Sequence, residues 1–290
     1  MHTLSFTLAD VTVTLETPLP VVCTDNFRPF LGRGGSRTVR AVFREVPVLP
    51  EAAGRTEYET VTFSVLRTAE GFLRRYRDQD GRVYAVGRTT PEGAEVAYLP
   101  WSRLYFSETH NCVSHIALEE QLLLRGRLIL HAAFVEAGET GLLFSGPSGV
   151  GKSTQASLWE RRGARILNGD RTVVSPDGAD WTAWGSPYAG SSRCFCNERR
   201  RLGAIAVLSQ APVCSVRRLT AAQAFRRLYP HLTVNSWSGG CVEQASGLLA
   251  ALAARVPVYH LACTPDEQAV ETLAKVLKED NVCGFEGSSL

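Results

Sequence analysis

The segment LLFSGPSGVGKSTQ, residues 142–155, constrains the fold more than any other part of this 290-residue chain. An apolar run leads into a glycine-rich loop, and a helix-like run follows a single lysine. Residues 146–153 satisfy the spacing G-x-x-x-x-G-K-[ST] that is typical of loops that cradle phosphates. Glycines let backbone N–H groups turn inward, and the start of the following helix adds partial positive charge. We therefore predict a strand, a phosphate-binding loop and a helix within an α/β fold.

The residue types in this loop predict separate roles. Lys152 is expected to reach the β- and γ-phosphates of a nucleotide, and the Ser153 hydroxyl to bind Mg²⁺, which prefers hard oxygen ligands. Thr154 follows and can assist. The predicted nucleotide-binding residues are Gly146, Pro147, Ser148, Gly149, Val150, Gly151, Lys152, Ser153 and Thr154. The alternative is a glycine-rich turn between strand and helix that binds nothing.

Phosphoryl transfer also needs an acid, either for the metal or for the proton of a nucleophile. Asp170 is the nearest candidate, because it ends the strand after the loop helix and can return to the mouth of the loop. Asn168 and Gly169 are also a turn signal, so a carboxylate that only decorates a turn is the alternative. We predict that Asp170 is catalytic and, with Ser153, a metal ligand.

A histidine lies one hairpin before the loop. His131 opens the strand run HAAFVEAG, where a lone histidine is usually packed and hydrogen-bonded structure. Beside a phosphate loop it can instead orient or tune an acid. We predict that His131 and Lys152 join Asp170 in the catalytic set.

Arginines cluster in and after the polar stretch GSPYAGSSR. They are Arg193, Arg199, Arg200 and Arg201, and Arg171 follows the predicted acid. Guanidinium groups suit the spreading charge of a transferring phosphoryl group, whereas a solvated surface run is the alternative. Arg201 precedes the apolar strand LGAIAVL and is the predicted catalytic arginine.

Composition excludes some classes of partner. The net charge of +2 gives no electrostatic case for nucleic acid or an anionic membrane. No apolar run approaches the ~18 to 20 residues of a membrane span, and the strand-like N-terminus does not read as a signal peptide. A cytoplasmic location is therefore expected. The eight cysteines are scattered, which in that compartment predicts reduced, mostly unreactive thiols.

The pattern of apolar residues changes along the chain. Residues 1–110 alternate with period two and predict an antiparallel, β-rich N-terminal region, with a hairpin at Asp80-Gly81. Residues 112–126 have helical spacing, with Gly126 as a C-terminal cap. Alternating strands and helices follow, so residues 111–280 predict an α/β core with a mixed sheet. Residues 281–290 are expected to be a flexible tail.

The order of motifs in the second region resembles the HPr kinase family of the phosphoenolpyruvate-carboxykinase-like fold. LLLRGRLILHAA ends near His131, and GLLFSGPSGVGKST, ARILNGDRTVV, WGSPYAG and LGAIAVLSQA follow in that order. The resemblance implies an ATP- and Mg²⁺-dependent kinase that phosphorylates a hydroxyl, often that of serine. It implies that Asp170 acts as base or metal ligand, that His131 supports it, and that Arg201 or Arg193 contacts phosphate. Such proteins often form homo-oligomers.

The chain departs from the family pattern at one informative position. The acid pair of the family is Asp-Asp, and here it is Gly169-Asp170. True HPr kinases also carry a kinase/phosphorylase signature and an N-terminal pattern that are not clear here. The predicted acceptor is therefore a small molecule or a peptide rather than HPr. The alternatives are a nucleotide-binding regulatory module without phosphotransfer and a carboxykinase-like enzyme.

Overall fold

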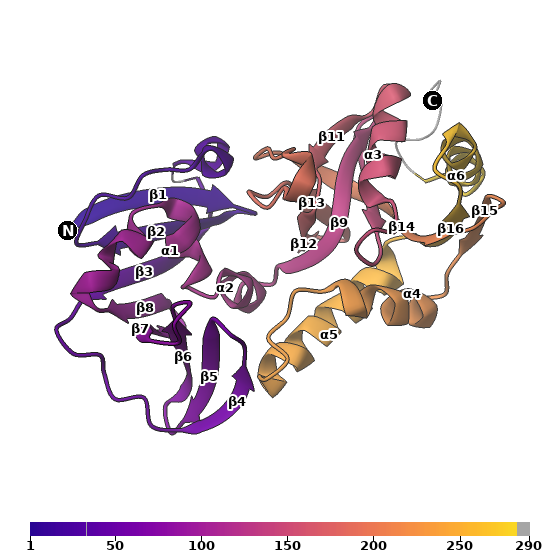
Figure 1. Ribbon diagram of the computed structural model, residues 1–290. Helices are drawn as coiled ribbons and strands as arrows, with labels where there is room; N and C mark the ends of the chain where they lie inside the picture. Colours follow the sequence, from indigo (N-terminus) through magenta and orange to yellow (C-terminus); the bar gives the residue numbers. More distant parts are fainter. Residues whose placement is uncertain (33, 283–290) are drawn as a thin grey trace. The chain divides into compact units, whose positions relative to one another are not determined.

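The computed structural model describes residues 1–32 and 34–282, and it divides into two compact units (Figure 1). Unit 1 comprises Met1–Arg125 and Asn235–Gly239, and unit 2 comprises Gly126–Val234 and the chain from Gly240 onward. The sequence predicted a domain boundary between residues 110 and 111. In the structure unit 1 continues to Arg125, so the two short helices in this stretch belong to unit 1. Most of the tail predicted for 281–290 lies outside the described residues. None of the described helices is long and apolar enough to cross a membrane.

Unit 1 is built on a mixed sheet with strand order β1-β2-β3-β8-β7-β6-β5-β4. The strands are β1 (His2–Leu8), β2 (Val11–Thr17), β3 (Arg37–Glu45), β4 (Arg55–Glu59), β5 (Phe63–Thr68), β6 (Gly71–Arg77), β7 (Val83–Thr89) and β8 (Gly93–Tyr98). The predicted hairpin at Asp80-Gly81 is confirmed, because β6 and β7 pair antiparallel across it. The prediction of a wholly antiparallel sheet is wrong, since β3 pairs in parallel with both β2 and β8.

The helical part of unit 1 differs from the single helix predicted for residues 112–126. The elements are η1 (Asp25–Phe30), η2 (Pro100–Phe106), α1 (Thr109–Ser114) and α2 (Leu118–Leu124). Ala117 separates the two α-helices with a left-handed φ of 53°. That backbone conformation cannot continue a right-handed helix, so the helical spacing is shared by two short pieces.

Unit 2 holds a second mixed sheet, with strand order β10-β9-β12-β13-β14-β16-β15 and β11 paired to β9. The strands are β9 (Leu128–Ala137), β10 (Thr140–Ser145), β11 (Arg165–Asn168), β12 (Arg171–Asp177), β13 (Asp180–Trp184), β14 (Arg199–Gln210), β15 (Ser215–Arg218) and β16 (Val258–Cys263). β10 also pairs with β14, so β9, β12, β13, β14 and β10 form a closed cycle of strand pairs. The mixed α/β fold predicted for this region is confirmed.

Several helical elements accompany this sheet in the sequence. They are α3 (Lys152–Arg161), η3 (Gly190–Ser192), α4 (Ala221–Leu228), η4 (Tyr229–His231), α5 (Gly239–Arg255) and α6 (Glu267–Glu279). Figure 1 shows α3 along the long strand β9 and α6 beside β15 and β16. Apolar side chains of α3, including the fully buried Trp159, pack with those of α6, such as Leu273, over β10, β14 and β16. This packing fixes the start of α3 at the carboxyl end of β10.

Candidate active site

The glycine-rich loop joins β10 to α3, in the strand–loop–helix context that the sequence predicts. Gly146, Gly149 and Gly151 have positive φ values of 151°, 77° and 113°. Residues with a Cβ rarely adopt these conformations, which explains why glycine recurs at these positions. Gly151 is the N-cap residue of α3, and its carbonyl accepts a hydrogen bond from the N–H of Gln155.

Lys152 begins α3 and folds back over the loop. Its Nζ donates to the carbonyl oxygens of Gly146 and Pro147, at 3.0 and 2.9 Å. The side chain is buried, and burial lowers its pKa below the usual value, while the charge of Asp170 acts in the opposite direction. Ser153 and Thr154 follow in the first turn and are exposed. An ammonium group is thus held at the loop, next to two exposed hydroxyls.

Asp170 lies between β11 and β12, which both pair antiparallel with β9 and follow one another along it. The alternative of a simple hairpin turn at Asn168 therefore does not apply. The Asp170 carbonyl accepts from Ala132 N–H at 2.9 Å, and its N–H donates to Asn168 Oδ1 at 3.0 Å. These bonds fix the backbone of the acid beside the middle of β9.

His131 is brought directly to this acid. Its Nε2 lies 3.1 Å from Asp170 Oδ1, and both side chains are about one-third exposed. Burial, followed by the nearby charge of Lys152, holds the pKa of His131 below its usual value, and Asp170 partly opposes this. A neutral imidazole in this position donates its Nε2–H to the carboxylate. His131, Lys152 and Asp170 are therefore brought together, as the sequence predicts.

Two neighbouring residues shape the surroundings of the acid. Arg171 Nε lies 3.8 Å from Asp170 Oδ2, and the Arg171 guanidinium lies over the ring of Tyr188, 5.6 Å from its centroid. Gly190 has a φ of 56°, and a Cβ added there would meet the Cβ of Asp170 at 3.0 Å. The 185–193 loop therefore packs against the carboxylate.

The structure does not bring Arg201 to the glycine-rich loop. β14 runs parallel to β10, with Leu202 beside Gly141 and Val207 beside Ser145. Arg201 therefore lies at the end of the sheet opposite to the loop, where its NH2 donates to Asp180 at 3.1 Å. The other arginines at the start of β14 also have partners there, with Arg199 over Trp184 and Arg200 bound to Glu136 and Glu198.

His231 lies near His131 and Lys152, a proximity that the sequence did not predict. The N–H of Thr233 donates to Ile129, and Leu232 forms an antiparallel bridge with Leu130. His231 is the last residue of η4 and directly precedes this bridge, and His131 directly follows Leu130 on β9. Burial first, then His131 and Lys152, hold the pKa of His231 below its usual value. The pairing joins residues far apart in the chain, so no local pattern in the sequence could indicate it.

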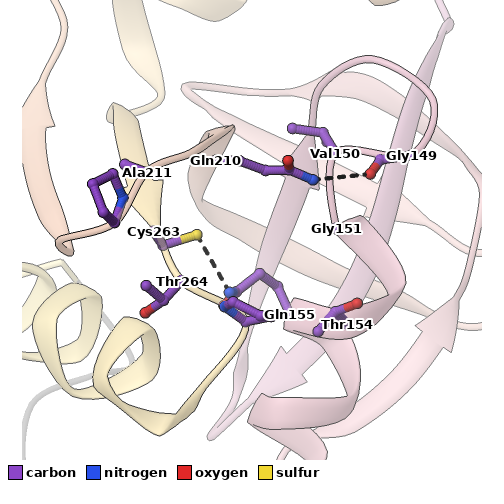
Figure 2. A pocket seen from close by; sticks show the side chains of 11 residues that line it. Gly149, Val150, Gly151, Thr154, Gln155, Gln210, Ala211, Cys263 and Thr264 are labelled. Carbon is purple, nitrogen blue, oxygen red and sulfur yellow. Dashed lines mark hydrogen bonds between the residues drawn. The ribbon is translucent and has the colours of Figure 1, made fainter.

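A pocket of about 530 Å³ opens beside the glycine-rich loop (Figure 2). It lies at the carboxyl ends of the parallel strands β10, β14 and β16. In α/β sheets ligands commonly bind at this edge. Its lining residues are Gly149, Val150, Gly151, Thr154, Gln155, Gln210, Ala211, Pro212, Cys263, Thr264 and Pro265. Figure 2 shows the amide of Gln210 reaching the Gly149 carbonyl, and that of Gln155 reaching Cys263.

Comparison with solved structures finds a likeness to the Hpr(Ser) kinase/phosphatase from Coxiella burnetii, with a TM-score of 0.35 and 13% sequence identity. The match covers 53% of this chain and 97% of that chain. No family model and no curated protein matches the sequence. So distant a likeness assigns neither a family nor an activity to this chain, and the family resemblance stays a prediction.

Proposed function

We propose that unit 2 binds a nucleoside triphosphate, with ATP as the expected cofactor, and transfers its terminal phosphoryl group to a hydroxyl of a small molecule or peptide. The observation that carries this proposal is the position of the Asp170 carboxylate. It is hydrogen-bonded to His131 and interacts electrostatically with Lys152 at the glycine-rich loop. An acid, an oriented imidazole and a loop suited to polyphosphate are the elements that phosphoryl transfer requires.

The pocket beside the loop supports a nucleoside as the group that carries the phosphates. A ligand whose phosphates lie over residues 146–151 has its sugar and base next to Thr154 and Cys263, within about 530 Å³ of space. Pockets for small molecules and cofactors are typically about 300 to 1,000 Å³ in volume. The pocket is therefore large enough for a nucleoside.

The residues at the loop also fit Mg²⁺. The Ser153 hydroxyl is exposed at the start of α3, and Asp170 supplies a carboxylate, so with phosphate oxygens and waters they offer hard ligands. Bound Mg²⁺ would neutralise the charge on the phosphates. A second carboxylate at position 169 has no room, because a Cβ added to Gly169 would lie 1.7 Å from Ser192 Oγ. Asp170 is thus the acid available on this segment.

The reaction follows from these positions. Asp170 accepts the proton of the acceptor hydroxyl as its oxygen attacks the terminal phosphorus, and the bond to the bridging oxygen breaks to release the nucleoside diphosphate. The hydrogen bond from His131 keeps the carboxylate turned toward the loop. When the nucleotide binds, the Lys152 ammonium group donates its hydrogen bonds to phosphate oxygens instead of to the carbonyl oxygens of Gly146 and Pro147. Its positive charge then stabilises the negative charge on the transferring group.

A transfer screen tests this proposal. Wild-type protein, [γ-³²P]ATP and Mg²⁺ are incubated with free amino acids, peptides and cell extract, and label in an acceptor is measured. Asp170→Asn should keep nucleotide binding and lose transfer about 100-fold or more. Asp177→Asn, an exposed aspartate at the end of β12, is the matched control. Binding without transfer to any acceptor would instead identify a nucleotide-binding module.

A further inference from the structure

We propose that His231 is a further phosphate-binding residue of this site, whose imidazole contacts the terminal phosphoryl group of the bound nucleotide. The inference rests on the proposed function and adds a residue to it. Its first support is the backbone pairing between β9 and the segment that follows η4. Thr233 N–H donates to the Ile129 carbonyl at 3.0 Å, and Leu232 bridges Leu130.

This pairing brings the histidine next to the site. His231 is the last residue of η4 and directly precedes the bridge between Leu232 and Leu130, and His131 directly follows Leu130 on β9. β12 occupies the other edge of β9, where Arg171 pairs with His131. The two histidines come from distant parts of the chain, and both His131 and Lys152 act electrostatically on His231.

The surroundings of His231 fit an anion rather than a structural partner. Its imidazole is half-buried, and among the described residues it makes no hydrogen bond to another side chain or to the backbone. The charged or titratable groups that influence it are His131 of β9 and Lys152 of α3. A half-buried donor among groups that can carry positive charge gains most from a negatively charged ligand. The terminal phosphate of a nucleotide held by the loop is such a ligand.

The contrast between a triphosphate and a diphosphate tests the inference. Affinities of a non-hydrolysable ATP analogue and of ADP are measured by titration calorimetry with Mg²⁺, for wild type, His231→Ala and His231→Gln. We expect His231→Ala to weaken the analogue about tenfold or more and ADP less than twofold. His231→Gln keeps a hydrogen-bond donor and should recover part of the loss. His260→Ala, a half-buried histidine on β16, is the matched control and should change neither affinity.

Equal effects on both nucleotides, or no effect on either, would overturn the inference. Circular dichroism and thermal melts of each variant establish that the protein is folded, and His231→Gln replaces the alanine variant if that variant does not fold. The binding readout does not require turnover. Selective loss of the triphosphate in a protein that transfers no phosphate would therefore support His231 and overturn the proposed function. A wild-type protein that binds neither nucleotide would overturn both.

Discussion

His131 Nε2 lies 3.1 Å from Asp170 Oδ1, which joins a strand residue before the glycine-rich loop to an acid after the loop helix. β9 makes this possible, because Arg171 pairs with His131 and the Asp170 carbonyl accepts from Ala132. Each partner is therefore held through its backbone, and the hydrogen bond sets the orientation of the carboxylate. If Asp170 is the base of a phosphoryl transfer, this hydrogen bond determines how the carboxylate is oriented toward the acceptor hydroxyl.

Replacing His131 with alanine should lower kcat with little change in the KM for ATP. A hydrogen bond to a charged group contributes about 1.5 to 3 kcal/mol, which corresponds to a loss of about 10- to 150-fold in rate if the bond is needed in the transition state. Steady-state kinetics of His131→Ala with the acceptor found in the transfer screen measures this. His260→Ala serves as the control for removal of a histidine in unit 2. A raised KM with unchanged kcat would indicate that His131 binds nucleotide instead.

Gly190→Ala should impair transfer by moving Asp170. Gly190 has a φ of 56°, and its added Cβ would meet the Cβ and Cγ of Asp170 at 3.0 and 3.1 Å. Gly178 has a similar φ of 60° but open space where a Cβ would lie, so Gly178→Ala carries the same backbone strain without the contact. We expect Gly178→Ala to lose about 1 kcal/mol of stability in urea unfolding, and Gly190→Ala to lose more because of the added contact. Only Gly190→Ala is expected to lose activity. Equal activities of the two variants would contradict this role of the 185–193 loop.

Filling the pocket should separate recognition of the nucleoside from recognition of phosphate. Cys263 lines the pocket, and Cys263→Phe adds a ring to its space of about 530 Å³. We expect ATP to bind at least about tenfold more weakly, whereas inorganic tripolyphosphate, which needs only the loop, keeps its affinity. Val213→Phe, at an exposed position outside the pocket lining, should leave both affinities unchanged. Parallel losses for both ligands would show that the pocket and the loop are not separate parts of one site.

Local patterns in the sequence predicted the glycine-rich loop, whose conformation depends on residues that are close together in the chain. The glycine-rich loop between β10 and α3 depends on residues that are adjacent in the chain, and the glycines require positive φ values. His131 lies one hairpin before the loop and Asp170 follows the strand after the loop helix, and these positions placed both residues in the predicted catalytic set. Whether these residues bind nucleotide stays a prediction, as does homo-oligomerisation.

Pairings between distant segments were not predictable in the same way. β3 pairs in parallel with β8 across a long separation, and the four-residue strand β15 pairs antiparallel with β16. Neither register follows from the alternation of apolar residues. The same limit explains the two errors at the site. Arg201 follows the 185–193 loop closely in sequence but lies at the end of β14 far from the glycine-rich loop. His231 comes near His131 only because the next residue, Leu232, bridges Leu130 of β9.

The stability of unit 1 should fall in acid because of a buried histidine. His115 Nδ1 lies 2.6 Å from the Asn111 carbonyl oxygen, and its Nε2 lies 2.7 Å from the Tyr84 hydroxyl. The neutral ring fits both partners, donating at Nδ1 and accepting at Nε2. Burial lowers the pKa of His115 from 6.5 to about 4. The unfolded chain therefore binds a proton more readily between these pH values, and folding becomes less favourable as the pH falls.

The neutral His115 ring thus makes its full contribution to the free energy of unfolding above pH 6.5. This contribution falls by about 3 kcal/mol in total as the pH is lowered to about 4. Urea unfolding of the wild type, His115→Gln and His110→Gln between pH 7.5 and 4.5 measures it. Carboxylates also titrate in this range, so the informative quantity is the difference in slope between proteins. His115→Gln should start less stable and lose less on acidification, and the exposed His110→Gln should follow the wild type. If the free energy of unfolding depends on pH in the same way for His115→Gln and the wild type, protonation of the His115 ring does not destabilise the folded protein.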